Sequence, residues 1–328
     1  MNILVTGGAG YIGSHAARWL ARAGHDVWAY DNLSLGHRAA APSGRLIVGE
    51  LADRELLART LAERSIEAVM HFAAFAAVGE SVADPAKYYQ NNVVASLVLL
   101  EAMRDAAVNR IVFSSTTATY GAPERLPISE DEPQRPINPY GFAKLVIERA
   151  LADYAKAYGF GYAALRYFNA AGASPEGDLG EDHSPESHLV PIVLEVALGR
   201  RERITIFGDD YPTPDGTCVR DYVHVDDLAA AHVAALARLT PGKGIELNLG
   251  TGRGHSVREV IEACRRVTGH PIPCVVGPRR AGDPPELVAD SRRAQALLGW
   301  RPKYTDLDSI VGTAWRWHST HPRGYADR

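Results

Sequence analysis

The sequence predicts an α/β fold, in which a doubly wound and mainly parallel sheet is followed by a smaller C-terminal domain. Two observations lead to this fold class. Strand-like runs alternate with helix-like stretches through the first half of the 328 residues, and these runs are apolar throughout, which is typical of strands buried on both faces. After residue 170 the chain becomes rich in Gly, Pro and Asp, which indicates a loop and the start of a second lobe.

The elements of the first half follow one another as strand and helix. Strands are expected over "NILVT" (2–6), "DVWAY" (26–30), "RLIVG" (45–49), "EAVMHFA" (67–73), "RIVFSS" (110–115) and "GYAALRYF" (161–168). Helices are expected over 11–23, near 53–64, near 84–106 and near 140–158. This order predicts βαβ units and therefore a parallel sheet covered by helices on both faces.

Two later elements suggest that the lobes are interleaved. The stretch "VDDLAAAHVAALARL" (225–239) is typical of a helix, for which Asp226 is expected as the N-cap, and "IELNLG" (245–250) of a strand that can return to the first sheet. The first domain is therefore expected to comprise residues 1–172 with 223–250. The second domain would comprise residues 173–222 with 251–328.

Composition excludes several classes of protein. Hydrophobic residues make up 46% of the chain and charged residues 23%, and the formal net charge is −4, so no basic surface for nucleic acid is expected. Cys218, Cys264 and Cys274 form no CxxC pair, which argues against a disulfide framework and a thiolate metal site. No signal peptide is expected, and no apolar run approaches the roughly 18 residues that span a bilayer. A cytoplasmic protein without membrane partners is predicted.

The segment "GGAGYIG" directly follows the first expected strand. It satisfies G-x-G-x-x-G through Gly8, Gly10 and Gly13, and G-x-x-G-x-x-G through Gly7, Gly10 and Gly13. Such glycines let the backbone turn tightly and approach a pyrophosphate at the start of the next helix. A simple strand-to-helix turn is the alternative, but the place of the motif at the first strand predicts a dinucleotide-binding Rossmann domain.

Asp31 indicates which dinucleotide is bound. It lies at the end of the second expected strand, 18 residues after Gly13, where a carboxylate can accept hydrogen bonds from an adenosine ribose diol and repels a 2′-phosphate. The alternative is a turn or cap residue in "DNLS". The spacing favours NAD over NADP.

Tyr140 and Lys144 are four residues apart at the expected start of a helix, and therefore share one face. A nearby ammonium stabilises phenolate, so the pKa of Tyr140 is expected to fall from its ordinary value near 10. Upstream, "SSTTATYG" places Ser114 and Thr116 at the carboxyl end of a central strand, where open α/β sheets bind ligands. An exposed helix pair and strand-end turn chemistry are the alternatives. The combination predicts proton transfer by Tyr140, with Thr116 beside the substrate.

Motifs along nearly the whole chain resemble those of one family. They include "VTGGAGYIGSH", "YDNLS", "HFAAFAAVGES", "FSSTTATYG", "NPYGFAK", "LRYFNAAGA", "GDDYPTPDGTCVRDYVHVDDLA", "NLGTGRGHSV" and "RRAGDPPELVAD". The chain resembles the extended short-chain dehydrogenases that act on nucleotide sugars, and among them the UDP-galactose (UDP-glucose) 4-epimerases. The later motifs are the specific ones, because a generic dehydrogenase lacks them.

The resemblance implies three sets of site residues. Thr116, Tyr140 and Lys144 are implied to be catalytic. The residues implied to bind NAD are Gly7, Gly10, Tyr11, Ile12, Gly13, Asp31, Asn32, Ser34, Glu50, Leu51, Phe72, Ala73, Ala74, Asn91, Ser114, Tyr140, Lys144 and Phe168. Those implied to bind the UDP-sugar are Thr116, Asn169, His188, Leu189, Thr205, Phe207, Arg220, Arg280, Asp283 and Leu287. Arg220 and Arg280 would hold the diphosphate through guanidinium forks, and Asp283 a ribose diol.

The implied reaction interconverts UDP-glucose and UDP-galactose. Tyr140 takes the proton of the 4-hydroxyl while NAD is reduced, and the transient 4-keto sugar turns over before C4 is reduced from its other face. Leu287 stands where some members have tyrosine, so UDP-N-acetylhexosamines are hypothesised to fit as well. A homodimer is the family expectation. The alternatives are another NAD-dependent epimerase, acting on a UDP-pentose or UDP-uronate, and a non-catalytic NAD-binding regulator.

No metal site is expected from the sequence. The residues that invite one are His224, Asp226, Asp227 and His232, but their spacing matches no zinc site and Asp226 suits a helix cap.

Overall fold

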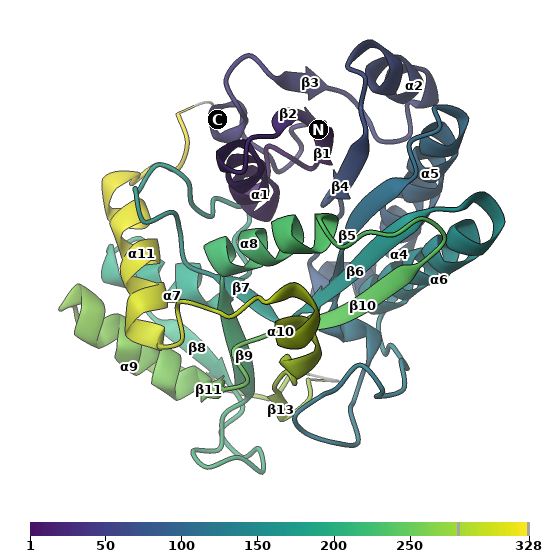
Figure 1. Cartoon of the computed structure of the whole chain (residues 1–328). Helices are drawn as coiled ribbons and strands as arrows, with labels where there is room; N and C mark the ends of the chain where they lie inside the picture. The colour runs from purple at the N-terminus through teal and green to yellow at the C-terminus, as the bar shows by residue number, and fades with distance from the viewer. Residues whose placement is uncertain (281–282, 327–328) are drawn as a thin grey trace.

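The central element is a seven-stranded sheet with the strand order β10-β6-β5-β4-β1-β2-β3 (Figure 1). It is seen in a computed structural model that describes residues 1–280 and 283–326. Every pairing within this sheet is parallel. The order reverses between β1 and β4, which creates the switch point where such sheets bind ligands. The predicted α/β fold class is confirmed.

The elements of the first half lie close to their predicted positions. The strands are β1 (Asn2–Thr6), β2 (Asp26–Asp31), β3 (Leu46–Val48), β4 (Ala68–His71), β5 (Arg110–Thr116) and β6 (Gly161–Tyr167), and the helices between them include α1 (Tyr11–Arg22), α2 (Arg54–Glu63) and α6 (Pro139–Tyr158). Short helical turns lie at Arg38–Ala40 and Thr117–Thr119. The expected helix over 84–106 is instead divided into α4 (Pro85–Tyr88), a π-helical segment (Tyr89–Val94) and α5 (Ala95–Asp105), and α3 (Val78–Ala83) precedes it.

Side chains that alternate along the strands build two cores. Ile3 and Val5 of β1 belong to the core beneath α1 and α8 (Val225–Leu236), whereas Leu4 belongs to the core beneath α2, α5 and α6. Figure 1 shows these helices as layers on either side of the sheet. Burial of both faces explains why the strand segments are apolar throughout.

The second half adds a smaller lobe and also returns to the first sheet. The lobe contains β7 (Asn169–Ala171), α7 (Leu189–Ala197), β8 (Ile204–Phe207), β9 (Val219–His224), β11 (Gly254–Ser256), α9 (Val257–Thr268), β12 (Cys274–Gly277), β13 (Glu286–Leu287) and α11 (Leu307–Thr320). A core between α7, α9 and α11 supports it. β10 (Gly244–Leu249) pairs with β6, and α10 (Arg292–Leu298) packs near α8.

The predicted N-cap of α8 is wrong. The helix begins at Val225, and His224 is its N-cap, because the His224 Nδ1 atom accepts a hydrogen bond from the backbone nitrogen of Asp226 at 3.1 Å. Asp226 therefore lies within the first helical turn, where a carboxylate interacts favourably with the positive end of the helix dipole. Over residues 1–280 and 283–326, no helix is long and apolar enough to cross a membrane.

Candidate active site

The glycine-rich turn lies between β1 and α1 and requires two of its glycines. Gly7 has a φ of +72°, and a Cβ there would lie 2.6 Å from the backbone nitrogen of Ala73. A Cβ on Gly13 would lie 2.1 Å from the carbonyl oxygen of Gly7. Any side chain would therefore clash with backbone, and the absence of side chains leaves the start of α1 open to a phosphate group.

Asp31 ends β2 beside this turn, and its carboxylate is buried. One oxygen accepts a hydrogen bond from the backbone nitrogen of Ala9 at 3.0 Å, and the other from that of Leu33 at 2.8 Å. Burial raises the pKa of Asp31 even though both hydrogen bonds oppose the shift. Each carboxylate oxygen has more than one lone pair. The fixed carboxylate can therefore still accept hydrogen bonds from a ribose diol.

Helix α6 brings Tyr140 to the end of β5. Asn138 caps the helix by accepting a hydrogen bond from the Gly141 backbone nitrogen at 2.8 Å, and Pro139 occupies the first turn, as is common at helix starts. The helix start packs closely, since a Cβ on Gly141 would lie 2.4 Å from the carbonyl oxygen of Ala118. In this arrangement the Thr116 hydroxyl hydrogen-bonds the Tyr140 phenol.

Lys144 lies one turn further along α6 and is buried. Its Nζ donates a hydrogen bond to the carbonyl oxygen of Ser114 at 2.7 Å and lies 4.8 Å from the centre of the Phe113 ring. Burial lowers the pKa of Lys144 to about 7, and the Glu148 carboxylate opposes this shift. The side chain therefore gives up its proton more readily than an ordinary lysine.

The expected lowering of the Tyr140 pKa is not found in the protein alone. Burial raises the pKa of the phenol, and the hydrogen bond from Thr116 only opposes that rise. The reason is that desolvation disfavours phenolate, while Lys144 loses much of its own charge through the same burial. A phenolate here needs added positive charge.

Charged groups stand at the other end of the site. Arg220 on β9 forms an ion pair with Asp283 and donates to the carbonyl oxygen of Val219 at 2.7 Å. The Arg280 guanidinium carbon lies 4.2 Å from the centre of the Phe207 ring. Arg220 therefore pairs with Asp283, while the neighbouring Asp221 is buried and accepts hydrogen bonds from Thr251, Gly252 and Ala289.

One cleft of about 1570 Å³ joins these parts. Every residue implied by the family resemblance lines it, from the glycine-rich turn to the loop that carries Asp283. The lining therefore runs from Gly7 to Leu287 and combines the glycine-rich turn, the Tyr140 phenol and two arginines. Such a cleft can hold two extended nucleotides end to end.

Comparisons with known proteins agree with this geometry. Residues 3–250 match the model of the NAD dependent epimerase/dehydratase family. The chain is 55% identical to the UDP-glucose 4-epimerase of Halalkalibacterium halodurans over 327 residues, covering 99% of this chain and 98% of the relative.

The chain belongs to this epimerase family. Its structure is similar to that of the Brucella ovis UDP-glucose 4-epimerase solved with NAD, with a TM-score of 0.92, 52% identity, and coverage of 96% and 97% of the two chains. It is also similar to the Bifidobacterium longum enzyme solved with NAD⁺ and UDP, with a TM-score of 0.95, 41% identity, and coverage of 99% and 100%.

The residues of this epimerase fit NAD. The glycine-rich turn leaves room that a Cβ would fill, Asp31 offers a fixed carboxylate, and Asn32 links to Glu50 through a hydrogen bond of 3.1 Å at the same end of the cleft. Ala73 also approaches the turn closely, because its backbone nitrogen lies beside Gly7. The enzyme is accordingly an NAD-dependent epimerase.

Some cleft residues were not found by sequence reasoning. His183 and Glu186 line the cleft together with His188, and Glu181 contacts both histidines. The signal was present as the spacing E-x-H-x-x-E-x-H in "EDHSPESH". A metal site was also considered at His224, Asp226, Asp227 and His232. The Asp227 carboxylate instead accepts hydrogen bonds from the backbone nitrogens of Lys303 and Tyr304, both at 3.0 Å.

Proposed function

We propose that this epimerase interconverts UDP-glucose and UDP-galactose by inverting C4 of the hexose. The observation that carries the proposal is the convergence of Thr116, Tyr140 and Lys144 at the carboxyl end of β5, inside a cleft that also contains the dinucleotide turn. Identity over the full length to UDP-glucose 4-epimerases favours this reaction over a UDP-pentose or UDP-uronate substrate. It also favours catalysis over a non-catalytic NAD-binding regulator.

Each domain has its own task in this proposal. Residues 1–172 with 223–250 bind NAD, and residues 173–222 with 251–328 bind the nucleotide sugar. Gly7, Gly10 and Gly13 receive the pyrophosphate, and Asp31 the ribose. Bound NAD supplies the redox step at C4, first oxidising and then re-reducing the same carbon.

Tyr140 moves the proton of the 4-hydroxyl group. Its phenolate oxygen accepts that proton as C4 is oxidised, and the phenol returns the proton to the 4-keto oxygen as C4 is reduced on the other side of the ring. The hydrogen bond from Thr116 favours the phenolate, because it lowers the pKa of Tyr140. Lys144 in its protonated form does the same, and so does the positive charge that oxidised NAD carries.

Arginine residues hold the nucleotide while the hexose turns. Arg220 and Arg280 suit the diphosphate, because guanidinium forks bind phosphate oxygens in pairs. Arg220 is already held in place by Asp283 and by the Val219 carbonyl oxygen, so it loses little side-chain freedom on binding. The Asp283 carboxylate has further lone pairs that can accept hydrogen bonds from the uridine ribose.

Leu287 sets how large a 2-substituent the sugar can carry. It lies on β13 opposite Arg220 of β9 and lines the cleft. Leucine is smaller than the tyrosine that some relatives have at this position and lacks the phenolic hydroxyl. We therefore propose that UDP-N-acetylhexosamines are additional substrates.

Two further proposals concern the state of the protein in the cell. Tyr89, Val94 and Phe142 are apolar side chains that are more than a third exposed on the π-helical segment and α6, and such a surface suits a homodimer. Sedimentation of the wild type and of Phe142→Glu tests the dimer, since the new charge is expected to yield monomers.

The thiols Cys218, Cys264 and Cys274 are free, which supports a location in the reducing cytoplasm.

The experiment that tests the function uses purified protein and UDP-galactose without added NAD. Formation of UDP-glucose is expected from the wild type, and Tyr140→Phe is expected to lose the factor of roughly 10²–10⁴ that positioned proton transfer contributes. Tyr158→Phe is the matched control, since Tyr158 lies on the same helix but is half exposed and outside the cleft. Equal rates in the wild type and Tyr140→Phe would refute the assigned role.

A further inference from the structure

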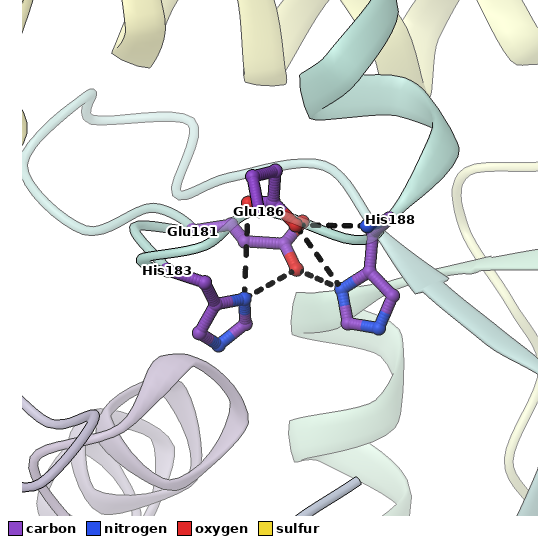
Figure 2. A group of neighbouring side chains, drawn as sticks. All are labelled: Glu181, His183, Glu186 and His188. Atoms are coloured by element: carbon purple, nitrogen blue, oxygen red, sulfur yellow. Dashed lines mark hydrogen bonds and ion pairs between the residues drawn. The ribbon is translucent and has the colours of Figure 1, made fainter. Parts of the chain in front are cut away.

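Four potential metal ligands gather in one loop before α7. Glu181, His183, Glu186 and His188 each offer one ligand atom, and these atoms all lie within 4.8 Å of one another. Figure 2 shows both imidazole rings with Nδ1 directed at the two carboxylates. The spacing E-x-H-x-x-E-x-H brings all four from eight consecutive residues. The expected role of His188 at the UDP-sugar does not explain why Glu181, His183 and Glu186 gather around it.

The distances suit tetrahedral coordination. The His183 Nδ1 atom lies 3.3 Å from a Glu181 oxygen and 3.8 Å from a Glu186 oxygen, and the His188 Nδ1 atom lies 3.9 Å from a Glu186 oxygen. His188 also contacts Glu181. Nitrogen and oxygen ligands about 2.0–2.1 Å from a tetrahedral zinc are separated by about 3.4 Å. Only small shifts of the side chains are therefore needed.

The carboxylates are fixed before any ion binds. One Glu186 oxygen accepts hydrogen bonds from the backbone nitrogens of Ser187 at 2.7 Å and His188 at 2.8 Å. The backbone at Glu181 is also anchored, because its carbonyl oxygen accepts a hydrogen bond from the indole nitrogen of Trp317 on α11 at 3.1 Å. Supporting contacts of this kind orient metal ligands in known sites.

Two carboxylates in this position need positive charge. The Glu181 side chain is 3% exposed and that of Glu186 is 7% exposed, and burial of unpaired charge is costly. One divalent cation bound by both carboxylates supplies this positive charge.

We propose that Glu181, His183, Glu186 and His188 form a binding site for one zinc-class divalent ion, with two nitrogen and two oxygen ligands. Two imidazoles with two carboxylates suit zinc better than calcium or magnesium, which prefer oxygen ligands alone. Four protein ligands close the coordination sphere, which is typical of a structural zinc site. The ion holds the loop that forms one wall of the cleft, and this role does not depend on the proposed reaction.

Metal binding at this site must release protons. Zinc binds neutral imidazole nitrogens and therefore competes with protons for them. Binding of the ion therefore displaces any proton that the ligand nitrogens carry, and that proton passes to the solvent.

Calorimetry on the full-length protein tests the site after treatment with a chelator and removal of that chelator. Titration with zinc sulfate is expected to show one ion per chain, with proton release measured in buffers of different ionisation enthalpy. His183→Gln and Glu181→Gln are each expected to weaken binding by more than the roughly 10–100-fold that loss of an outer-sphere partner causes. The controls are His270→Gln, an exposed histidine elsewhere, and Cys274→Ser, an exposed thiol; both should bind zinc as the wild type does.

Cobalt(II) provides a second measurement that needs no variant. The wild type loaded with cobalt is expected to show the intense visible absorption of a tetrahedral site without a thiolate charge-transfer band, and zinc should abolish it. Zinc should also raise the Tm of the wild type but not that of His183→Gln. Absence of stoichiometric zinc binding, an octahedral cobalt spectrum, or equal affinities in the wild type and both ligand variants would each overturn the proposal.

Discussion

The Nζ atom of Lys144 donates a hydrogen bond of 2.7 Å to the carbonyl oxygen of Ser114. This contact joins the first turns of α6 to the carboxyl end of β5, where Thr116 and Tyr140 meet. The lysine thus has two roles. It fixes the position of the helix that carries the phenol, and it carries an ionisable amine whose pKa is lowered by burial. Several measurable properties depend on this arrangement.

Replacement of Lys144 by methionine is expected to change how stability depends on pH. The folded pKa of about 7 lies below the ordinary value of 10.5, so between these values the unfolded chain binds one more proton at this site than the folded chain. The contribution of Lys144 to the free energy of unfolding therefore rises with pH across this window, by at most about 1.4 kcal/mol per pH unit. Below pH 7 it is constant.

Urea unfolding at pH 7 and pH 9 measures this effect. The difference in free energy of unfolding between the wild type and Lys144→Met should grow with pH in favour of the wild type. Lys156→Met, an exposed lysine of the same helix, should show a constant difference. A pH-independent difference for Lys144→Met would contradict a depressed lysine pKa.

Thr116→Val is expected to lower kcat while Thr116→Ser retains it. Valine has nearly the shape of threonine but cannot donate the hydrogen bond that lowers the pKa of Tyr140. A hydrogen bond to a charged group contributes about 1.5–3 kcal/mol, so a loss of about 10–100-fold is expected. The acidic limb of the pH profile of kcat also reports on the pair, because Tyr140 must begin as phenolate. An unshifted limb in Thr116→Val would separate a packing role from the proposed one.

Asp31→Asn is expected to weaken NAD binding by about 10–100-fold, because hydrogen bonds to a charged acceptor are lost. The amide also places an N–H group near the backbone N–H groups of Ala9 and Leu33, so a lower Tm is expected. Fluorescence titration with NAD gives the affinity, and Asp153→Asn, exposed on α6, is the control. Unchanged affinity in a folded Asp31→Asn protein would show that the carboxylate does not face the ribose.

Leu287→Tyr is expected to reduce turnover of UDP-N-acetylglucosamine far more than turnover of UDP-glucose. The larger side chain removes space beside the sugar from the wall that Leu287 lines, and overpacking costs about 1–3 kcal/mol, or roughly 10–100-fold. The ratio of kcat/KM values for the two substrates measures the effect. If the wild type shows no N-acetyl activity, the broader specificity is wrong.

Sequence patterns predicted those features that depend on local chemistry. The apolar strands and the glycine-rich turn need no distant partner to be interpreted, so β1 and the start of α1 fall where expected. The π-helical segment at Tyr89–Val94 has no such local signal. The N-cap of α8 was missed because histidine is an unusual cap, while Asp226 next to it is a common one.

Features that depend on tertiary burial were harder to predict. The spacing of Tyr140 and Lys144 showed that they share a helix face, but not that burial raises the pKa of the phenol and lowers that of the amine. The ion pair between Arg220 and Asp283 joins residues 63 positions apart in the chain, so no local pattern could indicate it. Sequence motifs indicated the members of the site, whereas the structure was needed for their charge states.

The most direct test of the account follows cofactor and sugar together in a single experiment. Purified wild-type protein is mixed with UDP-galactose while the absorbance of reduced nicotinamide and the products are measured over many turnovers. UDP-glucose is expected to accumulate to equilibrium while reduced cofactor stays below one equivalent per chain and no 4-keto sugar is released in proportion to turnover. Continuous build-up of reduced cofactor with an equal amount of oxidised sugar would contradict it.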